Sequence, residues 1–378
     1  MNENQLETII SERIRQQGRI TFCDYMAACL YEPGLGYYTS PGRKVGTAGD
    51  FYTSITVHAA FGRVVAREIA RMWRSLGQPA DFTLVEVGAG HGRLACDIMD
   101  FLAQREPDCY AASTLLLVEQ EPTLAEAQAT LLSAHAQKLG WRSPAQLAEL
   151  RFSGVVYSNE LLDAMPVHRV VMTAEGLREI YVTLQDGQLA EQLDQPSTPQ
   201  LEQYLARYGT PLLVGQEAEV SLAGLVWLET VAAALERGFV LTIDYGFPKE
   251  ELYTPRRRQG TLLCYHQHRV EDNPYIRLGQ QDITTHINFS ALMERGEELG
   301  LTTVWFGEQY RFLLSAGMVE EFEAIERAEL SEADKLKARL TLKRLIMPEG
   351  GMGDTFRVLV QSRGVEQPQL GCIKGIGL

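Results

Sequence analysis

The sequence lacks an excess of basic residues. Its 378 residues include 35 Lys and Arg against 49 Asp and Glu, which gives a net charge of -14. Nonspecific binding to nucleic acids or to anionic membranes needs a basic surface, so we expect neither. A local basic patch stays open, and Arg256–Arg258 is a candidate for it.

The chain also lacks long apolar runs and metal-type cysteine spacing. No apolar run approaches the roughly 18 residues of a membrane span, so we expect no membrane insertion. None of the six cysteines forms C-x-x-C or pairs with histidines at zinc spacing, which indicates reduced thiols. Residues 1–11 are polar and acidic and resemble no secretory or transit signal, so we expect a cytoplasmic protein.

The composition is that of a large folded protein. A hydrophobic content of 45% excludes a mostly disordered chain. The length allows one large α/β domain with insertions, or two domains. The sequence contains no internal repeat and no low-complexity linker.

A glycine-rich stretch after a predicted strand indicates a ligand site. Residues 83–87 predict a short buried strand, Gly88, Gly90 and Gly92 alternate after it, and a helix is predicted from Arg93. Glycine lets a ligand lie against the main chain, and the helix start adds free N–H groups. Many α/β folds hold nucleotide-like ligands in this way. The alternative is a tight turn without a ligand.

The glycine spacing separates two ligand classes. The dinucleotide fingerprint G-x-G-x-x-G would need its third glycine where this chain has Arg93. The motif in this chain is E-x-G-x-G-x-G: Glu86 lies two residues before Gly88, and Ala89 separates Gly88 from Gly90. It resembles the first motif of S-adenosylmethionine-dependent methyltransferases with a Rossmann-like fold. That donor carries a cationic sulfonium instead of a pyrophosphate, so an acid near the loop makes electrostatic sense.

Two further stretches contain candidate cofactor-binding residues. The apolar run 115–118 predicts a buried parallel strand that ends in Glu119, followed by Gln120. Glu119 lies about where a ribose-binding carboxylate ends the second strand of such folds, although it could be a solvated acid. Asp50, Thr53 and Ser54 precede a helix predicted over 56–76, and capping of that helix is their alternative role.

Polar residues at the end of another strand are candidates for the reacting end of the pocket. The strand predicted over 154–158 runs into Asn159, Glu160 and Asp163. Ligands of open α/β sheets bind at the carboxyl ends of strands, so we expect these side chains at the site. Asp163 could instead cap a turn before Pro166.

Three histidines in the irregular stretch 247–289 could suggest a metal. His266 and His268 have no cysteine nearby, so we expect no metal site. His286 is a candidate proton acceptor instead. Long irregular stretches are often lids or binding loops.

The remaining pattern predicts alternating helices and strands. Thr21 is the predicted cap of the second helix, and Asp186-Gly187 predicts a hairpin turn. The predicted helices cover residues 5–17, 20–30, 93–105, 122–138, 221–236, 290–299, 308–315 and 318–346, and the extended segments cover 168–195, 239–243, 301–306 and 356–360, with a loose tail from residue 364.

The chain resembles the MidA-like methyltransferases over residues 18–362. The resemblance rests on a series of motifs in one order: residues 31–38 (YEPGLGYY), 49–54 (GDFYTS), 86–92 (EVGAGHG), 159–168 (NELLDAMPVH), 243–246 (IDYG), 260–268 (GTLLCYHQH), 282–289 (DITTHINF) and 352–359 (MGDTFRVL). Thr56, Ala89 and His91 depart from the family's usual residues.

The resemblance implies a Rossmann-like class I methyltransferase fold with a mostly parallel seven-stranded sheet. It implies S-adenosyl-L-methionine as cofactor and a protein arginine substrate, since mitochondrial members of the family act in respiratory complex I assembly as arginine methyltransferases. The expected organisation is a helical N-terminal extension, a core with two insertions on the substrate side, and a loose tail: residues 1–80, 81–362 with insertions at 168–215 and 247–289, and 363–378. The sequence is also compatible with a homodimer.

Methyl transfer in line from a sulfonium depends on positioning. Carboxylates can hold a charged guanidinium bidentately, so we expect Glu160 and Asp163 to bind the acceptor. Two alternatives stay open: O- or N-methylation of a small molecule, and a cofactor-binding assembly chaperone without catalysis. A nicotinamide enzyme is disfavoured by Arg93.

Overall fold

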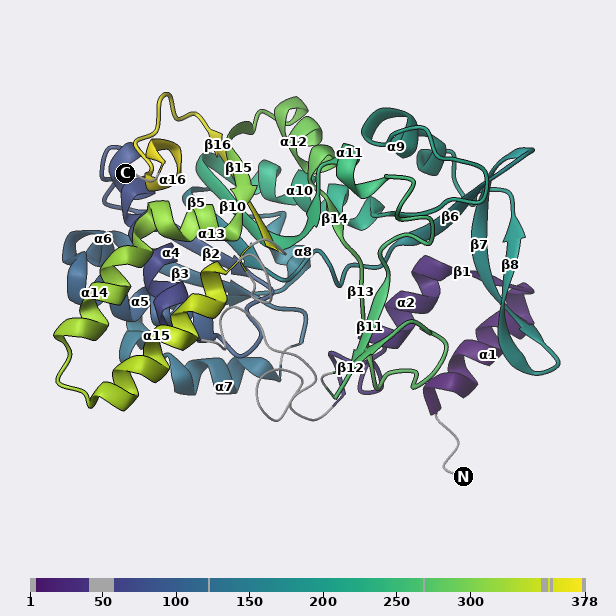
Figure 1. The fold of residues 1–378 in the computed structure, drawn as a ribbon, viewed down its shortest axis with the longest axis horizontal. Helices are drawn as coiled ribbons and strands as arrows, with labels where there is room; N and C mark the ends of the chain where they lie inside the picture. Colours follow the sequence, from purple (N-terminus) through teal and green to yellow (C-terminus); the bar gives the residue numbers. More distant parts are fainter. Residues whose placement is uncertain are drawn as a thin grey trace. The chain divides into compact units, whose positions relative to one another are not determined.

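The computed structural model describes residues 5–40, 58–121, 123–267, 269–347, 353 and 356–375 (Figure 1). The chain forms two compact units. Unit 1 comprises Met1–Tyr52, Leu162–Trp227 and Tyr245–Glu294, and unit 2 comprises Thr53–Leu161, Leu228–Asp244 and Arg295–Leu378. We place these boundaries differently from the sequence-based division, because the helix predicted over 56–76 belongs to unit 2.

Unit 2 is built on a mostly parallel β-sheet. Its strands follow the order β15 (Thr302–Glu308), β16 (Phe356–Arg363), β10 (Leu235–Phe247), β5 (Phe152–Asn159), β2 (Phe82–Val87), β3 (Ser113–Val118) and β4 (Leu139–Arg142). β4, β3, β2, β5 and β10 pair in parallel, and β15 pairs with β16 antiparallel. The predicted Rossmann-like fold with a mostly parallel seven-stranded path is confirmed.

The central strands are nearly continuous apolar runs because both faces of a parallel sheet are covered. The helices of this unit include α4 (Ala60–Ser75) and α5 (Arg93–Arg105), which pack against each other. The others are α6 (Pro107–Ala112), α7 (Leu124–Leu131), the 3₁₀ helix η1 (Ser133–Lys138), α8 (Pro144–Leu147), α13 (Gln309–Leu313), the π-helical η2 (Leu314–Met318), α14 (Val319–Arg327), α15 (Glu332–Ile346) and α16 (Gly371–Lys374). α10 (Leu222–Ala234) and α12 (Phe289–Glu298) each run across a boundary between the units.

Three sequence predictions for unit 2 were wrong in detail. The helix predicted over 122–138 is α7 followed by η1. The helix predicted over 318–346 is two helices, because the Ser331 side chain accepts a hydrogen bond from the Asp334 N–H and starts α15 afresh. The tail is not loose throughout: the buried Glu68 carboxylate accepts the N–H groups of Gly371 and Cys372 and holds α16.

Unit 1 contains a five-stranded antiparallel sheet and a three-stranded one. The first comprises β1 (Ile20–Thr21), β6 (His168–Thr173), β7 (Gly176–Gln185), β8 (Gln188–Asp194) and β9 (Glu217–Val220), and the second β11 (Leu263–His266), β12 (Arg269–Glu271) and β13 (Asp282–Thr284). Gln185 faces Gln188 across the predicted Asp186-Gly187 turn, which is confirmed. The strands within 247–289 escaped the sequence prediction because each has only two to four residues.

The helices of unit 1 pack their apolar sides into its cores. α1 (Gln5–Gln17) buries Leu6, Ile10 and Ile14. α2 (Phe22–Tyr31) begins after Thr21, whose side chain accepts the Asp24 N–H, so the predicted cap is confirmed. α9 (Gln200–Tyr208), α11 (Lys249–Leu252) and β14 (Ile287–Asn288) complete the unit, and β14 pairs in parallel with the last residues of β10.

Candidate functional site

The glycine loop follows β2 and leads directly into α5. Gly88, Gly90 and Gly92 have φ values of 74°, 51° and 78°, all in the left-handed region that favours glycine. A Cβ at Gly88 would lie 2.7 Å from Cδ1 of Leu161, whereas a Cβ at Gly90 would meet no atom of the described residues within 4 Å. The loop therefore packs closely at Gly88 and is open at Gly90.

Hydrogen bonds from two neighbouring segments hold the loop. The Gly90 N–H donates to Oε2 of Glu119 at 2.9 Å, and the Nε2 of Gln128 donates to the Gly90 carbonyl at 2.6 Å. Trp141 Nε1 in turn donates to Oε1 of Gln128 at 2.8 Å. The structure thus brings Glu119 to the loop, as the sequence spacing predicts. Gln128 was missed because nothing in its helical pattern distinguishes it.

Gln120 and Ala89, two further candidate cofactor-binding residues, take part in the loop mainly through their backbone. Gln120 is exposed, and its N–H donates to Oε1 of Glu119 at 2.8 Å. The Ala89 carbonyl accepts the Gly92 N–H at 2.8 Å, which closes the turn before α5. Asp50, Thr53 and Ser54 lie outside the described residues.

Glu86 is an interior carboxyl group on β2. It is 2% exposed, and the Tyr157 hydroxyl donates to its Oε2 at 3.2 Å. The pKa of Glu86 is raised to about 8, mainly because of burial; the Tyr157 hydrogen bond opposes this shift and the nearby charge of Glu119 adds to it. A pKa near 8 favours the protonated form of Glu86 at neutral pH.

Residues at and after the end of β5, together with Ile243 and Asp244 of β10, form a second polar group in unit 2. Asn159 Nδ2 donates to Oε1 of Glu160 at 2.9 Å. Glu160 has a φ of 53°, which is unusual for a residue with a side chain. Its N–H donates to the Ile243 carbonyl at 3.0 Å, and the Leu161 N–H donates to Oδ2 of Asp244 at 3.2 Å. Two predicted residues, Asn159 and Glu160, are thus held together.

Asp163 and His286 belong to unit 1 and are linked through one backbone contact. The Asp163 carbonyl accepts the N–H of Thr285, the residue before His286, at 2.9 Å. The His286 ring is nearly parallel to that of Tyr245, with centroids 6.5 Å apart and an interplanar angle of 12°. Asp163 is buried.

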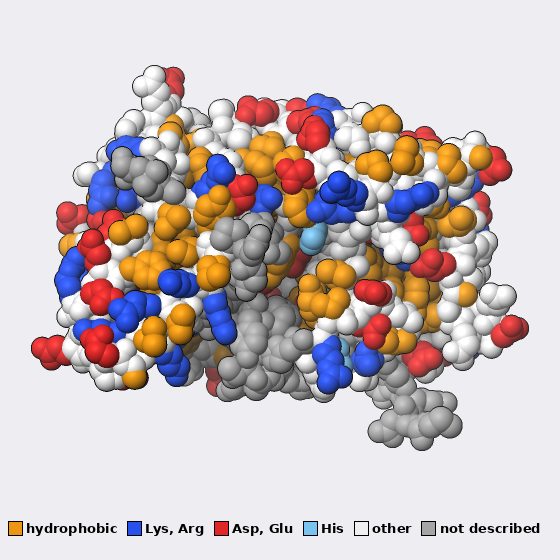
Figure 2. Space-filling model, in the orientation of Figure 1, with side chains coloured by type: hydrophobic (Ala, Val, Ile, Leu, Met, Phe, Trp, Pro, Cys, Tyr) orange, Lys and Arg blue, Asp and Glu red, His pale blue; other side chains and the backbone are white. Residues whose placement is uncertain are grey.

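The candidate basic run is engaged within unit 1. The Arg257 guanidinium lies 4.1 Å from the ring centroid of Phe247, and Arg258 Nη2 donates to the Val214 carbonyl at 3.0 Å. Figure 2 shows Lys and Arg side chains interspersed with Asp and Glu side chains on the face in view. Arg257 and Arg258 therefore each have a contact within unit 1.

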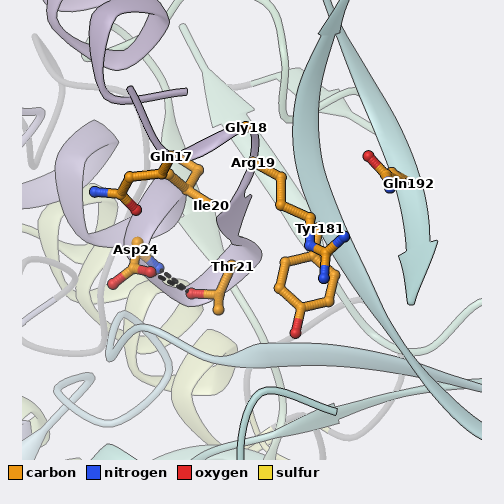
Figure 3. Close-up of a pocket in the computed structure, with 8 residues that line it drawn as sticks. All are labelled: Gln17, Gly18, Arg19, Ile20, Thr21, Asp24, Tyr181 and Gln192. Carbon is orange, nitrogen blue, oxygen red and sulfur yellow. Dashed lines mark hydrogen bonds between the residues drawn. The ribbon is translucent and has the colours of Figure 1, made fainter. Parts of the chain in front are cut away.

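Other described features lie apart from the predicted residues. A cavity of about 580 Å³ in unit 1 is lined by Arg19 between α1 and β1, by Asp24 of α2, by Tyr181 of β7 and by neighbouring residues (Figure 3). It contains none of the predicted site residues.

Within the described ranges, no group of three or more His, Cys, Asp or Glu is placed to hold a metal ion. No described helix is long and apolar enough to cross a membrane.

Comparison with known proteins adds independent findings. The sequence profile of a family described as "Putative S-adenosyl-L-methionine-dependent methyltransferase" matches residues 64–307. The protein arginine methyltransferase NDUFAF7 homolog of Drosophila melanogaster, a mitochondrial protein, is 28% identical over 320 residues, which cover 76% of this chain and 69% of that protein. Human NDUFAF7, also named a mitochondrial protein arginine methyltransferase, is 28% identical over 335 residues, with coverages of 81% and 72%.

A solved structure is similar over almost the whole chain. It is a crystal structure of a Burkholderia thailandensis protein bound to S-adenosyl-homocysteine, with 32% identity and a TM-score of 0.87. The match covers 97% of this chain and 94% of that one.

Proposed function

We propose that this chain, which belongs to the family of S-adenosyl-L-methionine-dependent methyltransferases, methylates an arginine side chain of a protein. The relatives named protein arginine methyltransferases support this acceptor, since they match most of the chain. The observation that carries the proposal is Glu160, a carboxylate at the end of β5 held in a strained backbone conformation. Such strain persists where function requires it.

The glycine loop fits the cofactor of this family. No described residue has an atom within 4 Å of the Cβ position at Gly90, which allows an adenosyl group to lie against the backbone there. The partly exposed Glu119 carboxylate at the end of β3 can accept hydrogen bonds from ribose hydroxyls in addition to the Gly90 N–H. When bound, S-adenosylmethionine supplies an activated methyl group on its sulfonium.

The acidic residues after β5 bind and orient the acceptor. A guanidinium stays protonated near neutral pH, so the Glu160 carboxylate attracts it and directs one nitrogen. Asn159 holds Oε1 of Glu160 and thereby limits the directions the carboxylate can take. From the sequence pattern, Asp163 is the candidate second carboxylate for the guanidinium, and His286 or a carboxylate is the candidate acceptor of the proton that the nitrogen releases.

Replacement of Glu160 by Gln tests this function. Glutamine keeps the shape and the oxygen that faces Asn159 but removes the negative charge. We expect Glu160→Gln to bind S-adenosylhomocysteine normally and to lower methyl transfer by about 100-fold or more. The exposed Glu149 provides the matched control, Glu149→Gln, which should transfer methyl groups at the wild-type rate.

The assay uses radiolabelled S-adenosylmethionine and a lysate of the native host that lacks this protein, with mass spectrometry of the labelled product. Label at arginine in a protein supports the proposal. Label confined to small molecules would overturn the arginine acceptor, and full turnover by Glu160→Gln would overturn the role of Glu160.

A further inference from the structure

The way β5 leaves the sheet involves a side chain that the sequence did not single out. The parallel ladder of β5 and β10 ends at the pair Asn159 and Ile243. The next N–H, from Glu160, still reaches the Ile243 carbonyl. The one after that, from Leu161, donates to the carboxylate of Asp244 instead of a backbone carbonyl. Asp244 is fully buried, so this carboxylate is part of the interior.

The two acceptors, the Ile243 carbonyl and the Asp244 carboxylate, fix the backbone of Glu160 and Leu161, whose side chains make different contacts. Glu160 takes its left-handed conformation and brings its carboxylate to Asn159. Leu161 packs its Cδ1 into the space that Gly88 leaves by having no Cβ. A rotation of the peptide between Glu160 and Leu161 would therefore disturb the carboxylate and the glycine loop together.

We infer that Asp244 is a positioning residue that sets the Glu160 carboxylate relative to the glycine loop by holding the Leu161 N–H. The inference rests on the proposed function for the role of Glu160, but the contact of Leu161 with Gly88 is independent of it. Methyl transfer in line requires the acceptor to be aligned within a fraction of an ångström, and such alignment depends on supporting residues. Asp244 supplies this support from the neighbouring strand.

Two substitutions separate positioning from folding. Asp244→Ala removes the acceptor for the Leu161 N–H, whereas Asp244→Asn keeps an oxygen in its place. In the labelled-lysate assay at saturating S-adenosylmethionine, we expect Asp244→Ala to lower apparent kcat by about 100-fold and to change the apparent KM for the acceptor by less than about threefold. Asp244→Asn should recover at least a tenth of the wild-type rate. Equal losses in both variants, or a loss confined to KM, would overturn the inference.

A second measurement needs no acceptor. Calorimetric titration with S-adenosylhomocysteine of Asp244→Ala, Leu161→Ala and the double variant forms a double-mutant cycle. If Asp244 acts through Leu161, Asp244→Ala should weaken binding about tenfold in the wild-type background and less than twofold in the Leu161→Ala background. Independent, additive losses would contradict the coupling.

A control identifies a merely structural effect. Glu68 is also a fully buried acid in unit 2 whose carboxylate accepts backbone N–H groups. Glu68→Ala should lower the melting temperature while leaving the affinity for S-adenosylhomocysteine unchanged. If Asp244→Ala behaves in the same way, Asp244 is structural and the inference fails. If Glu160→Gln keeps full turnover but the cycle is coupled, the proposed function fails at Glu160 while the Asp244–Leu161 contact stands.

Discussion

Gly90→Ala is the sharpest test of the glycine loop as the cofactor site. Gly90 has a φ of 51°, and a Cβ there would meet no atom of the described residues within 4 Å. The substitution therefore adds one methyl group without a steric clash against any described residue. Its cost to folding is the left-handed conformation alone, which is about 1 kcal/mol for alanine. A domain of this size should then lose roughly 2–4 °C of melting temperature.

The same methyl group has a larger effect on binding. If the adenosyl part of the cofactor lies against the Gly90 backbone, the added Cβ takes the space of ligand atoms. We expect the affinity for S-adenosylhomocysteine to fall by at least about tenfold, which corresponds to about 1.4 kcal/mol. Isothermal titration calorimetry measures the affinity, and differential scanning fluorimetry without ligand measures the melting temperature.

Gly77→Ala is the matched control for backbone strain. Gly77 lies in unit 2 between α4 and β2 and has a φ of 86°, and within the described part of the chain no atom lies within 4 Å of its Cβ position. It should lose a similar few degrees of melting temperature and keep its affinity. If Gly90→Ala binds S-adenosylhomocysteine as tightly as Gly77→Ala, the ligand does not lie against Gly90 and our reasoning about the loop is refuted.

Two other buried acids give measurable effects. The pKa of Glu86 rises from an ordinary 4.5 to about 8, so between these pH values the folded protein holds a proton that the unfolded chain releases. The free energy of unfolding should therefore fall as the pH rises from 4.5 to about 8, and Glu86→Gln should reduce this dependence on pH. Parallel melting curves of the two proteins against pH would contradict this. Glu68→Ala leaves the N–H groups of Gly371 and Cys372 without their acceptor and should cost about 3 kcal/mol. Denaturant unfolding measures this cost, and a change below about 1 kcal/mol would show that α16 does not depend on Glu68.

The parallel sheet was predictable because its signals are local. Each central strand is a short apolar run, and β2 is followed directly by three glycines that need left-handed φ values. The spacing of Glu119 after Gly92 also placed a carboxylate at the loop correctly. Because each of these signals depends on a few neighbouring residues, it can be recognised in the sequence without knowledge of the fold.

The parts that escaped prediction depend on contacts between distant segments. Gln128 looks like any polar helix residue until β4 brings Trp141 to its side chain. Asp244 looks like an ordinary acid after a strand until β5 places the Leu161 N–H beside it. Glu68 holds residues about 300 positions later in the chain. No pattern within one segment contains such information.

The division of the chain into units has a practical consequence for protein engineering. The chain leaves unit 2 for unit 1 directly after Leu161, and again directly after Asp244 in the middle of β10. No single stretch of the gene therefore encodes either unit. A minimal unit 2 cannot be made by truncation; it would need one designed linker from Leu161 to Leu228 and another from Asp244 to Arg295. Both linkers would begin beside the turn that carries Glu160, so the choice of their first residues would decide whether that turn keeps its conformation.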